Sequence, residues 1–325
     1  MKKGSGVQCR SMMDKKVICI VGPTASGKTA LSIALAKHYG GEIVSCDSMQ
    51  IYRGMDIGTA KPTEEEMQGI PHHMLSVADA DENFSAARYV EEAGCIVDDI
   101  LSRGKLPIIV GGTGLYVDSL INGIEFASYD ADETYRKELF EIYEKHGAEH
   151  VHEMLREVDP ERAAQIHPNN VKRVIRALEV FRATGETITA HDAETKEKPP
   201  RYDAVYIGLM YEDREKLYER INLRVDMMME AGLCDEVKKL LDAGVSSDAT
   251  AMQAIGYKEL VLYFEEKCSL HDASESIKQA SRRYAKRQMT WFKRNKAVNW
   301  IAADRTENFS DLLQTSINFI ALSSV

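Results

Sequence analysis

The chain has 325 residues, of which 44% are hydrophobic, so it can bury a substantial core and form two domains. It has no run of about 18 apolar residues and no apolar segment after its first basic residues, so we expect a cytoplasmic protein without a membrane span or secretory signal. The net charge of −10 argues against a nucleic-acid partner, and six cysteines without a C-x-x-C pair argue against a zinc finger.

The first predicted elements enclose a glycine-rich loop. Residues 17–21 form an apolar run typical of a buried strand, and residues 28–39 have the apolar spacing of a helix. Amide groups of such a loop bind phosphate oxygens, while Lys28 adds a charge and Thr29 a hydroxyl ligand for Mg²⁺. The diphosphate site predicted from the G-x-x-x-x-G-K-[ST] pattern consists of Gly22, Pro23, Thr24, Ala25, Ser26, Gly27, Lys28 and Thr29.

A second predicted strand, residues 42–46, ends immediately before Asp47. Ligands of open α/β sheets bind beyond the carboxyl ends of strands, so Asp47 is expected to face the phosphate loop. Two roles are open at this point: an Mg²⁺ contact through water, as in a P-loop ATPase, or chemistry on another substrate. A third strand at 106–110 is followed by residues 111–114, GGTG, without the acidic residue of a Walker B strand, which disfavours a hydrolytic NTPase. Helices are expected at 85–102, with Ser85 as the candidate N-cap, and from 113 onward.

The next segment, residues 122–198, is charged and has helical periodicity with few strand formers. We therefore predict an α/β fold, a P-loop NTPase-like doubly wound parallel sheet formed by residues 1–121 and 199–325, with an all-helical insertion at 122–198. His146 and His150 match the zinc-protease pattern H-x-x-E-H. Gly147 between them weakens a helix, so we do not predict a metal there.

The remaining elements are a strand at 204–211, helices at 213–231, 235–243 and 274–293, and a short strand at 298–302. Residues 278–294 contain seven basic side chains and no acidic one. On a helix, Arg283, Lys286, Arg287 and Arg294 share a face that suits an RNA backbone. A solvent-exposed helix face without a partner is the alternative.

Several motifs along the chain resemble those of the tRNA dimethylallyltransferase family, also called tRNA isopentenyltransferases, and they occur in the same order as in that family. The most specific is DSMQIYRGMDIGTAKP at 47–62, and KRQMTW lies at 286–291. The resemblance implies transfer of a dimethylallyl group from its diphosphate to N6 of the adenosine at tRNA position 37, by a P-loop core and a helical insertion that binds the anticodon stem-loop. The other motifs are residues 22–29, 71–73, 111–113, 176–180 and 256–257.

The resemblance also implies roles for single residues. Thr24 is expected to lie beside the bridging oxygen of the diphosphate, and Arg224 to contact the diphosphate. The chain resembles bacterial members of the family, because it has no C-terminal zinc finger. Gln253 and Lys258 stand where some relatives have arginines, and the spacing before Arg136 differs slightly from the family pattern. The implied tRNA contacts are Asp47, Ser48, Met49, Gln50, Thr113, Arg136, Arg173, Gln253 and Lys258, to which the basic helix adds Lys286 and Arg287.

Under this interpretation, Asp47 is the candidate general base, because the N6 amine of adenine is a poor nucleophile and must lose a proton as its new bond forms. Gln50 suits recognition of an adenine edge. We expect a monomer that uses Mg²⁺. The alternatives are an adenylate isopentenyltransferase acting on free AMP or ATP, a P-loop nucleotide kinase, and a non-catalytic RNA-binding module; the helical insertion and the basic helix favour tRNA.

Overall fold

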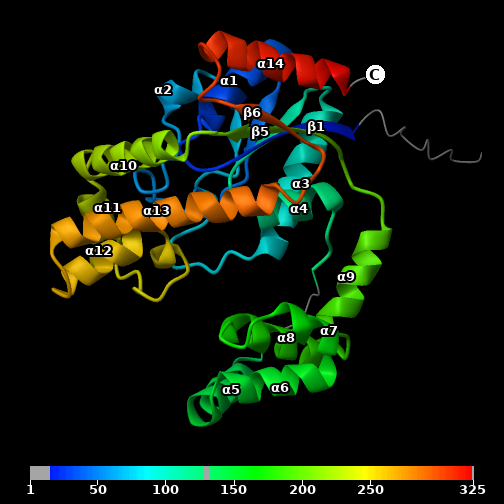
Figure 1. Cartoon of the computed structure of the whole chain (residues 1–325), viewed down its shortest axis with the longest axis vertical. Helices are drawn as coiled ribbons and strands as arrows, with labels where there is room; N and C mark the ends of the chain where they lie inside the picture. The colour runs from blue at the N-terminus through cyan, green and yellow to red at the C-terminus, as the bar shows by residue number, and fades with distance from the viewer. Residues whose placement is uncertain (1–14, 127–131, 324–325) are drawn as a thin grey trace, which may run out of the picture. The chain divides into compact units, whose positions relative to one another are not determined.

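A computed structural model describes residues 15–126 and 132–323, apart from the side chains of 195–197. The chain forms two compact units, one made of residues 1–123 and 201–325 and the other of residues 124–200 (Figure 1). Within the described residues, no helix is both long and apolar enough to cross a membrane. The described cysteines are free thiols, and Cys9 lies outside the described residues.

The larger unit is built on one parallel sheet with the strand order β3-β2-β4-β1-β5-β6. The register aligns Ile18 of β1 with Ile108 of β4 and Val205 of β5, and these side chains are buried. The predicted doubly wound, P-loop NTPase-like fold is confirmed. The strands are β1 (Lys16–Val21), β2 (Glu42–Ser45), β3 (His72–His73), β4 (Pro107–Val110), β5 (Asp203–Met210) and β6 (Val298–Ala302).

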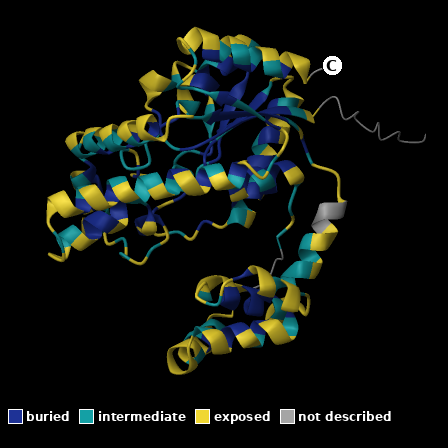
Figure 2. Ribbon diagram, viewed as in Figure 1, coloured by how far each residue is buried: buried dark blue, intermediate teal, exposed yellow. Residues whose placement is uncertain are grey.

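Helices cover both faces of this sheet, as Figure 1 shows. Helices α1 (Lys28–Tyr39) and α14 (Phe309–Leu322) pack on one face, and α3 (Ala86–Ser102) and α4 (Gly114–Asn122) on the other. Buried residues, coloured dark blue in the ribbon of Figure 2, are concentrated in the strands of the sheet and on the helix faces that pack against it. Ser85 is the predicted N-cap of α3, and its hydroxyl accepts a hydrogen bond from the Arg88 amide. The sequence patterns did not predict α14 or the two-residue strand β3.

The other elements of this unit lie near the carboxyl ends of the strands. Helix α13 begins at Leu270, four residues before its predicted start, because Ser269 and Asp272 form a capping box. Lys278 of α13 pairs with Asp226 of α10 at 2.7 Å, which joins these two helices. The elements are α2 (Glu64–Met67), α10 (Arg214–Glu230), α11 (Leu233–Asp242), a 3₁₀ turn (Ala251–Gln253), α12 (Tyr257–Phe264) and α13 (Leu270–Phe292).

The unit of residues 124–200 is helical in its described part and has its own core around Leu139, Leu155 and Ile175. Gly147 adopts φ +83° and separates two helices, so His146 and His150 do not share one helix. No group of three or more His, Cys, Asp or Glu side chains that could hold a metal ion occurs in the described part of the chain. The helices are α5 (Glu133–His146), α6 (Ala148–Val158), α7 (Pro160–Gln165), α8 (Val171–Thr184) and α9 (Ile188–Glu197).

A buried carboxylate lies at the amino end of β2, next to the edge strand β3. Glu42 at the start of β2 is 3% exposed and binds Arg103, Lys105 at 2.7 Å and His73 at 2.9 Å. The hydrogen bonds from Arg103, followed by those from Lys105 and His73, hold the pKa of Glu42 well below its ordinary value of 4.5. Folding lowers this pKa, so the stabilisation is present above pH 4.5 and is lost as the pH falls below that value.

Glu42→Gln is therefore expected to lower the free energy of unfolding at pH 7 by about 2 kcal/mol, because Arg103, Lys105 and His73 lose their charged acceptor. The measurement is urea unfolding of both proteins between pH 7 and 3, and the difference should shrink below pH 4.5. Glu91→Gln, at an exposed position of α3, is the control. A difference that does not depend on pH would contradict this account.

Candidate active site

The phosphate loop has the conformation that its glycines permit. Gly22 adopts φ +139°, and a Cβ there would lie 2.4 Å from the Leu209 carbonyl oxygen, so only glycine fits beside β5. Gly27, at φ +96°, is the N-cap residue of α1. The Lys28 ammonium donates a hydrogen bond to the Pro23 carbonyl at 2.7 Å. Burial, and then the nearby Arg224, lower the pKa of Lys28 to about 7, although Asp47 opposes this shift.

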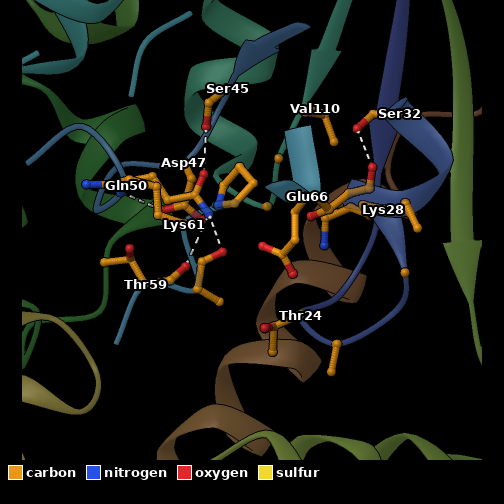
Figure 3. A pocket seen from close by; sticks show the side chains of 18 of the residues that line it. Thr24, Lys28, Ser32, Ser45, Asp47, Gln50, Thr59, Lys61, Glu66 and Val110 are labelled. Carbon is orange, nitrogen blue, oxygen red and sulfur yellow. Dashed lines mark hydrogen bonds between the residues drawn. The ribbon is translucent and has the colours of Figure 1, made fainter. Parts of the chain in front are cut away.

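This loop lines a cavity of about 920 Å³ at the carboxyl edge of the sheet. The lining includes the predicted Thr24, Lys28, Thr29, Asp47 and Arg224, which the loop, the first turn of α1, the turn after β2 and helix α10 contribute. Figure 3 shows Thr24, Lys28 and Asp47 around one open space. The structure thus brings the candidate catalytic residues together, as the parallel strand order predicts.

The Asp47 side chain is held by the turn that follows β2. One of its carboxylate oxygens, Oδ1, accepts a hydrogen bond from the Met49 amide at 2.9 Å. The Ser48 amide donates to the Thr113 hydroxyl at 3.0 Å, which ties this turn to the loop after β4. Asp47 therefore lies at a defined place on the cavity wall.

Gln50 is already occupied by contacts within the protein. Its Oε1 accepts from the Ser45 hydroxyl at 2.9 Å, and its Nε2 donates to the carbonyl oxygens of Thr59 at 3.1 Å and Ala60 at 3.2 Å. Direct recognition of an adenine edge by this amide requires at least one of these bonds to be exchanged.

Arg224 of α10 brings a guanidinium to the same cavity. Burial lowers the pKa of Arg224, while the carboxylates of Asp47 and Glu66 oppose that effect. Arg220, one turn earlier, donates a hydrogen bond to the Ala25 carbonyl at 3.1 Å and so supports the phosphate loop. The cavity combines a cationic rim, loop amides and the carboxylate of Asp47, which suits a diphosphate with a reaction beside it.

The residues predicted to contact tRNA are distributed over both units. In the larger unit Gln253, Lys258, Lys286 and Arg287 are exposed. In the unit of residues 124–200, Arg173 is exposed, and Arg136 pairs with the buried Glu179 at 2.6 Å.

Two of the basic side chains on α13 serve its packing. Lys278 binds Asp226 and Arg282 donates to Asn222, both on α10. The cations that remain on the C-terminal part of the helix and just after it include Lys286, Arg287 and Lys293, which are exposed.

The sequence patterns did not reveal four side chains that shape this site. Glu236 accepts hydrogen bonds from the amides of residues 56–58 and from the Tyr257 hydroxyl, so it holds the loop against which Gln50 packs. Tyr284 and Gln288 of α13 line the cavity, as does Glu66, whose carboxylate caps α2. Tyr284 and Gln288 are four residues apart and therefore lie on one face of α13, next to its basic face. This spacing could have indicated a second face of the helix that is directed into the protein.

Comparisons with known proteins show which family this chain is similar to. The family model described as IPP transferase matches residues 50–295. A protein named tRNA dimethylallyltransferase from Acetivibrio thermocellus is 49% identical over 94% of this chain and 97% of its own length, and one from Bacillus mycoides is 52% identical over 92% and 94%. The crystal structure of a tRNA isopentenylpyrophosphate transferase from Bacillus halodurans has a TM-score of 0.72 at 46% identity, covering 95% of this chain and 97% of that one. A eukaryotic dimethylallyltransferase that acts on tRNA has a TM-score of 0.77 at 32% identity, covering 94% and 80%.

Proposed function

We propose, from the premise that this chain belongs to the IPP transferase family, that it transfers a dimethylallyl group from dimethylallyl diphosphate to N6 of the adenosine at tRNA position 37. The products are N6-dimethylallyladenosine and diphosphate. The observation that carries this function is the single cavity that joins the phosphate loop, Arg224 and Asp47. Because the substrate is tRNA, the reaction takes place in the cytoplasm.

The phosphate loop holds the leaving group in this reaction. Breaking the allylic C–O bond leaves the electron pair on diphosphate, and the amides of residues 25–29, Lys28 and Arg224 stabilise the negative charge that develops. The Lys28 ammonium exchanges the Pro23 carbonyl for a phosphate oxygen, which favours its charged form.

Mg²⁺ fits this donor set. Mg²⁺ sites on phosphate ligands commonly use one or two protein oxygens, with phosphate and water as the other ligands, so no cluster of acids is needed. Thr29 is exposed and lines the cavity beside Lys28, so its hydroxyl would hold the ion. When bound, Mg²⁺ would neutralise part of the diphosphate charge.

Asp47 accepts the proton that the N6 amine loses as nitrogen bonds to the allylic carbon. The adenosine must leave its stack to reach this carboxylate, and a base in an anticodon loop leaves at lower cost than one in a duplex. The turn of residues 47–50 and Thr113 then contact the base and its neighbours, while the exposed cations of α13 contact the RNA backbone.

The test incubates purified protein with Mg²⁺ and labelled dimethylallyl diphosphate, with bulk tRNA in one tube and AMP in another. We expect label in tRNA, in a modified adenosine after nuclease digestion, and none in AMP. Label in AMP alone would assign an adenylate isopentenyltransferase. RNA-independent hydrolysis of ATP without any labelled product would show that the protein is an ordinary P-loop NTPase and not a prenyl transferase.

The exposed face of α13 leads to a separate prediction about salt. Replacing Lys286 and Arg287 with Gln removes two candidate phosphate-binding side chains, so the slope of log Kd against log salt for tRNA should flatten by about 0.7 for each phosphate that is no longer neutralised. Filter binding of tRNA over a series of KCl concentrations measures the slope, with the exposed Lys267→Gln as control. An unchanged slope would show that this face is only solvated.

A further inference from the structure

Helix α13 places one buried amide at the junction of two loops of the active site. Gln288 is 4% exposed. Its Oε1 accepts a hydrogen bond from the Thr24 amide of the phosphate loop at 2.8 Å, and its Nε2 donates to the Gly112 carbonyl in the loop after β4 at 3.1 Å. A single planar side chain therefore makes hydrogen bonds to both loops.

The contacts of Gln288 continue toward the turn that carries Asp47. Gly112 is followed in the chain by Thr113, and Tyr284, one helical turn before Gln288, lines the same cavity. Thr113 in turn accepts a hydrogen bond from the Ser48 amide at 3.0 Å. Because Gly112 and Thr113 are consecutive, hydrogen bonds link the residue next to Asp47, through the loop after β4 and Gln288, to Thr24 of the phosphate loop.

We propose that Gln288 is a positioning residue that sets the phosphate loop at the distance from the Asp47 turn that prenyl transfer requires. This inference rests on the proposed function. Gln288 acts through Thr24, and its own amide group is taken up by protein contacts. A displacement of reacting groups by about 1 Å lowers turnover about 10²-fold, so an amide that holds two loops together affects the rate more than it affects binding.

Gln288→Met keeps the volume of the side chain and removes both hydrogen bonds. We expect kcat for tRNA prenylation to fall about 10- to 100-fold, while KM for tRNA and for dimethylallyl diphosphate change less than about threefold, because the other loop amides and Lys28 remain. Gln279→Met, at an exposed position of the same helix, is the matched control and should be unchanged. All assays are made well below the measured Tm of each variant.

Gly112→Ala perturbs the same contact from the opposite side. A Cβ at Gly112 would lie 1.9 Å from Gln288 Nε2, and the end of that flexible side chain must move to make room. We expect a loss of kcat similar to that of Gln288→Met, and a double variant no slower than the slower single variant. Independent, multiplicative losses would overturn the proposal, and so would a wild-type kcat in folded Gln288→Met.

Amide hydrogen exchange separates this inference from the proposed function. Exchange in the peptide that contains Thr24 needs no substrate, and it should be faster in Gln288→Met than in the wild type. If the wild type transfers no prenyl group, the proposed function fails, and the exchange result alone decides whether Gln288 holds the loop. Unchanged exchange would overturn the positioning role.

Discussion

Replacement of Asp47 with Ala or with Asn is expected to lower kcat for tRNA prenylation about 10²- to 10⁴-fold, because either change removes the proton acceptor for the N6 amine. Single-turnover measurements with saturating tRNA and dimethylallyl diphosphate test this step directly. Binding of tRNA should be largely preserved, since many contacts away from Asp47 contribute to it.

The two Asp47 variants separate chemistry from local structure. The Asn side chain keeps an oxygen that accepts the hydrogen bond from the Met49 amide, whereas Ala loses it. If Asp47 only holds the turn, Asp47→Asn should be nearly as fast as the wild type and Asp47→Ala slow. If Asp47 is the base, both should be slow. A near-normal single-turnover rate in Asp47→Asn removes Asp47 from the role of base.

Arg224→Ala is expected to raise KM for dimethylallyl diphosphate about tenfold and to lower kcat about 10²- to 10³-fold, because the guanidinium stabilises charge that grows as diphosphate departs. Its partial burial in the cavity wall strengthens this interaction relative to an exposed arginine. Steady-state kinetics with dimethylallyl diphosphate as the varied substrate measure both parameters. Arg224→Lys should be intermediate, since an ammonium keeps the charge but loses the bidentate geometry.

The matched control for Arg224 is Arg214→Ala, at an exposed position in the first turn of the same helix, which should leave both parameters unchanged. An effect of Arg224→Ala on KM alone would mean that Arg224 binds substrate and transition state equally. No effect on either parameter would remove Arg224 from the diphosphate site.

Local patterns were sufficient for much of the site. The phosphate loop is contiguous in sequence, so its motif, its strand and its helix are visible together. Asp47 was placed correctly on the cavity because a parallel sheet brings the carboxyl ends of its strands to one edge. The Ser85 cap of α3 was also evident, because capping depends on side chains within one turn.

Features that depend on pairing across the fold were not predicted. Strand β3 has two residues and exists because it pairs with β2, which no local propensity indicates. The Gln50 side-chain amide donates hydrogen bonds to the carbonyl oxygens of Thr59 and Ala60. The loop that carries these carbonyl groups is held in turn by Glu236 of α11. The packing of the fold decides which backbone groups lie next to a side chain and can form hydrogen bonds with it. The residue type of Gln50 therefore indicated only that it can donate and accept hydrogen bonds, and not which partners it has.

The sequence by itself determined the fold class, the phosphate loop and the family resemblance, because each rests on residue types at short, fixed spacings. Only the tertiary structure decided how the loops of the site are joined. Gln288 and Thr24 are 264 residues apart in the sequence, and the Gln288 side chain points into the site because of how α13 packs against α10, α12 and α4. Such contacts are a consequence of helix orientation, which side-chain packing sets and which no local spacing encodes.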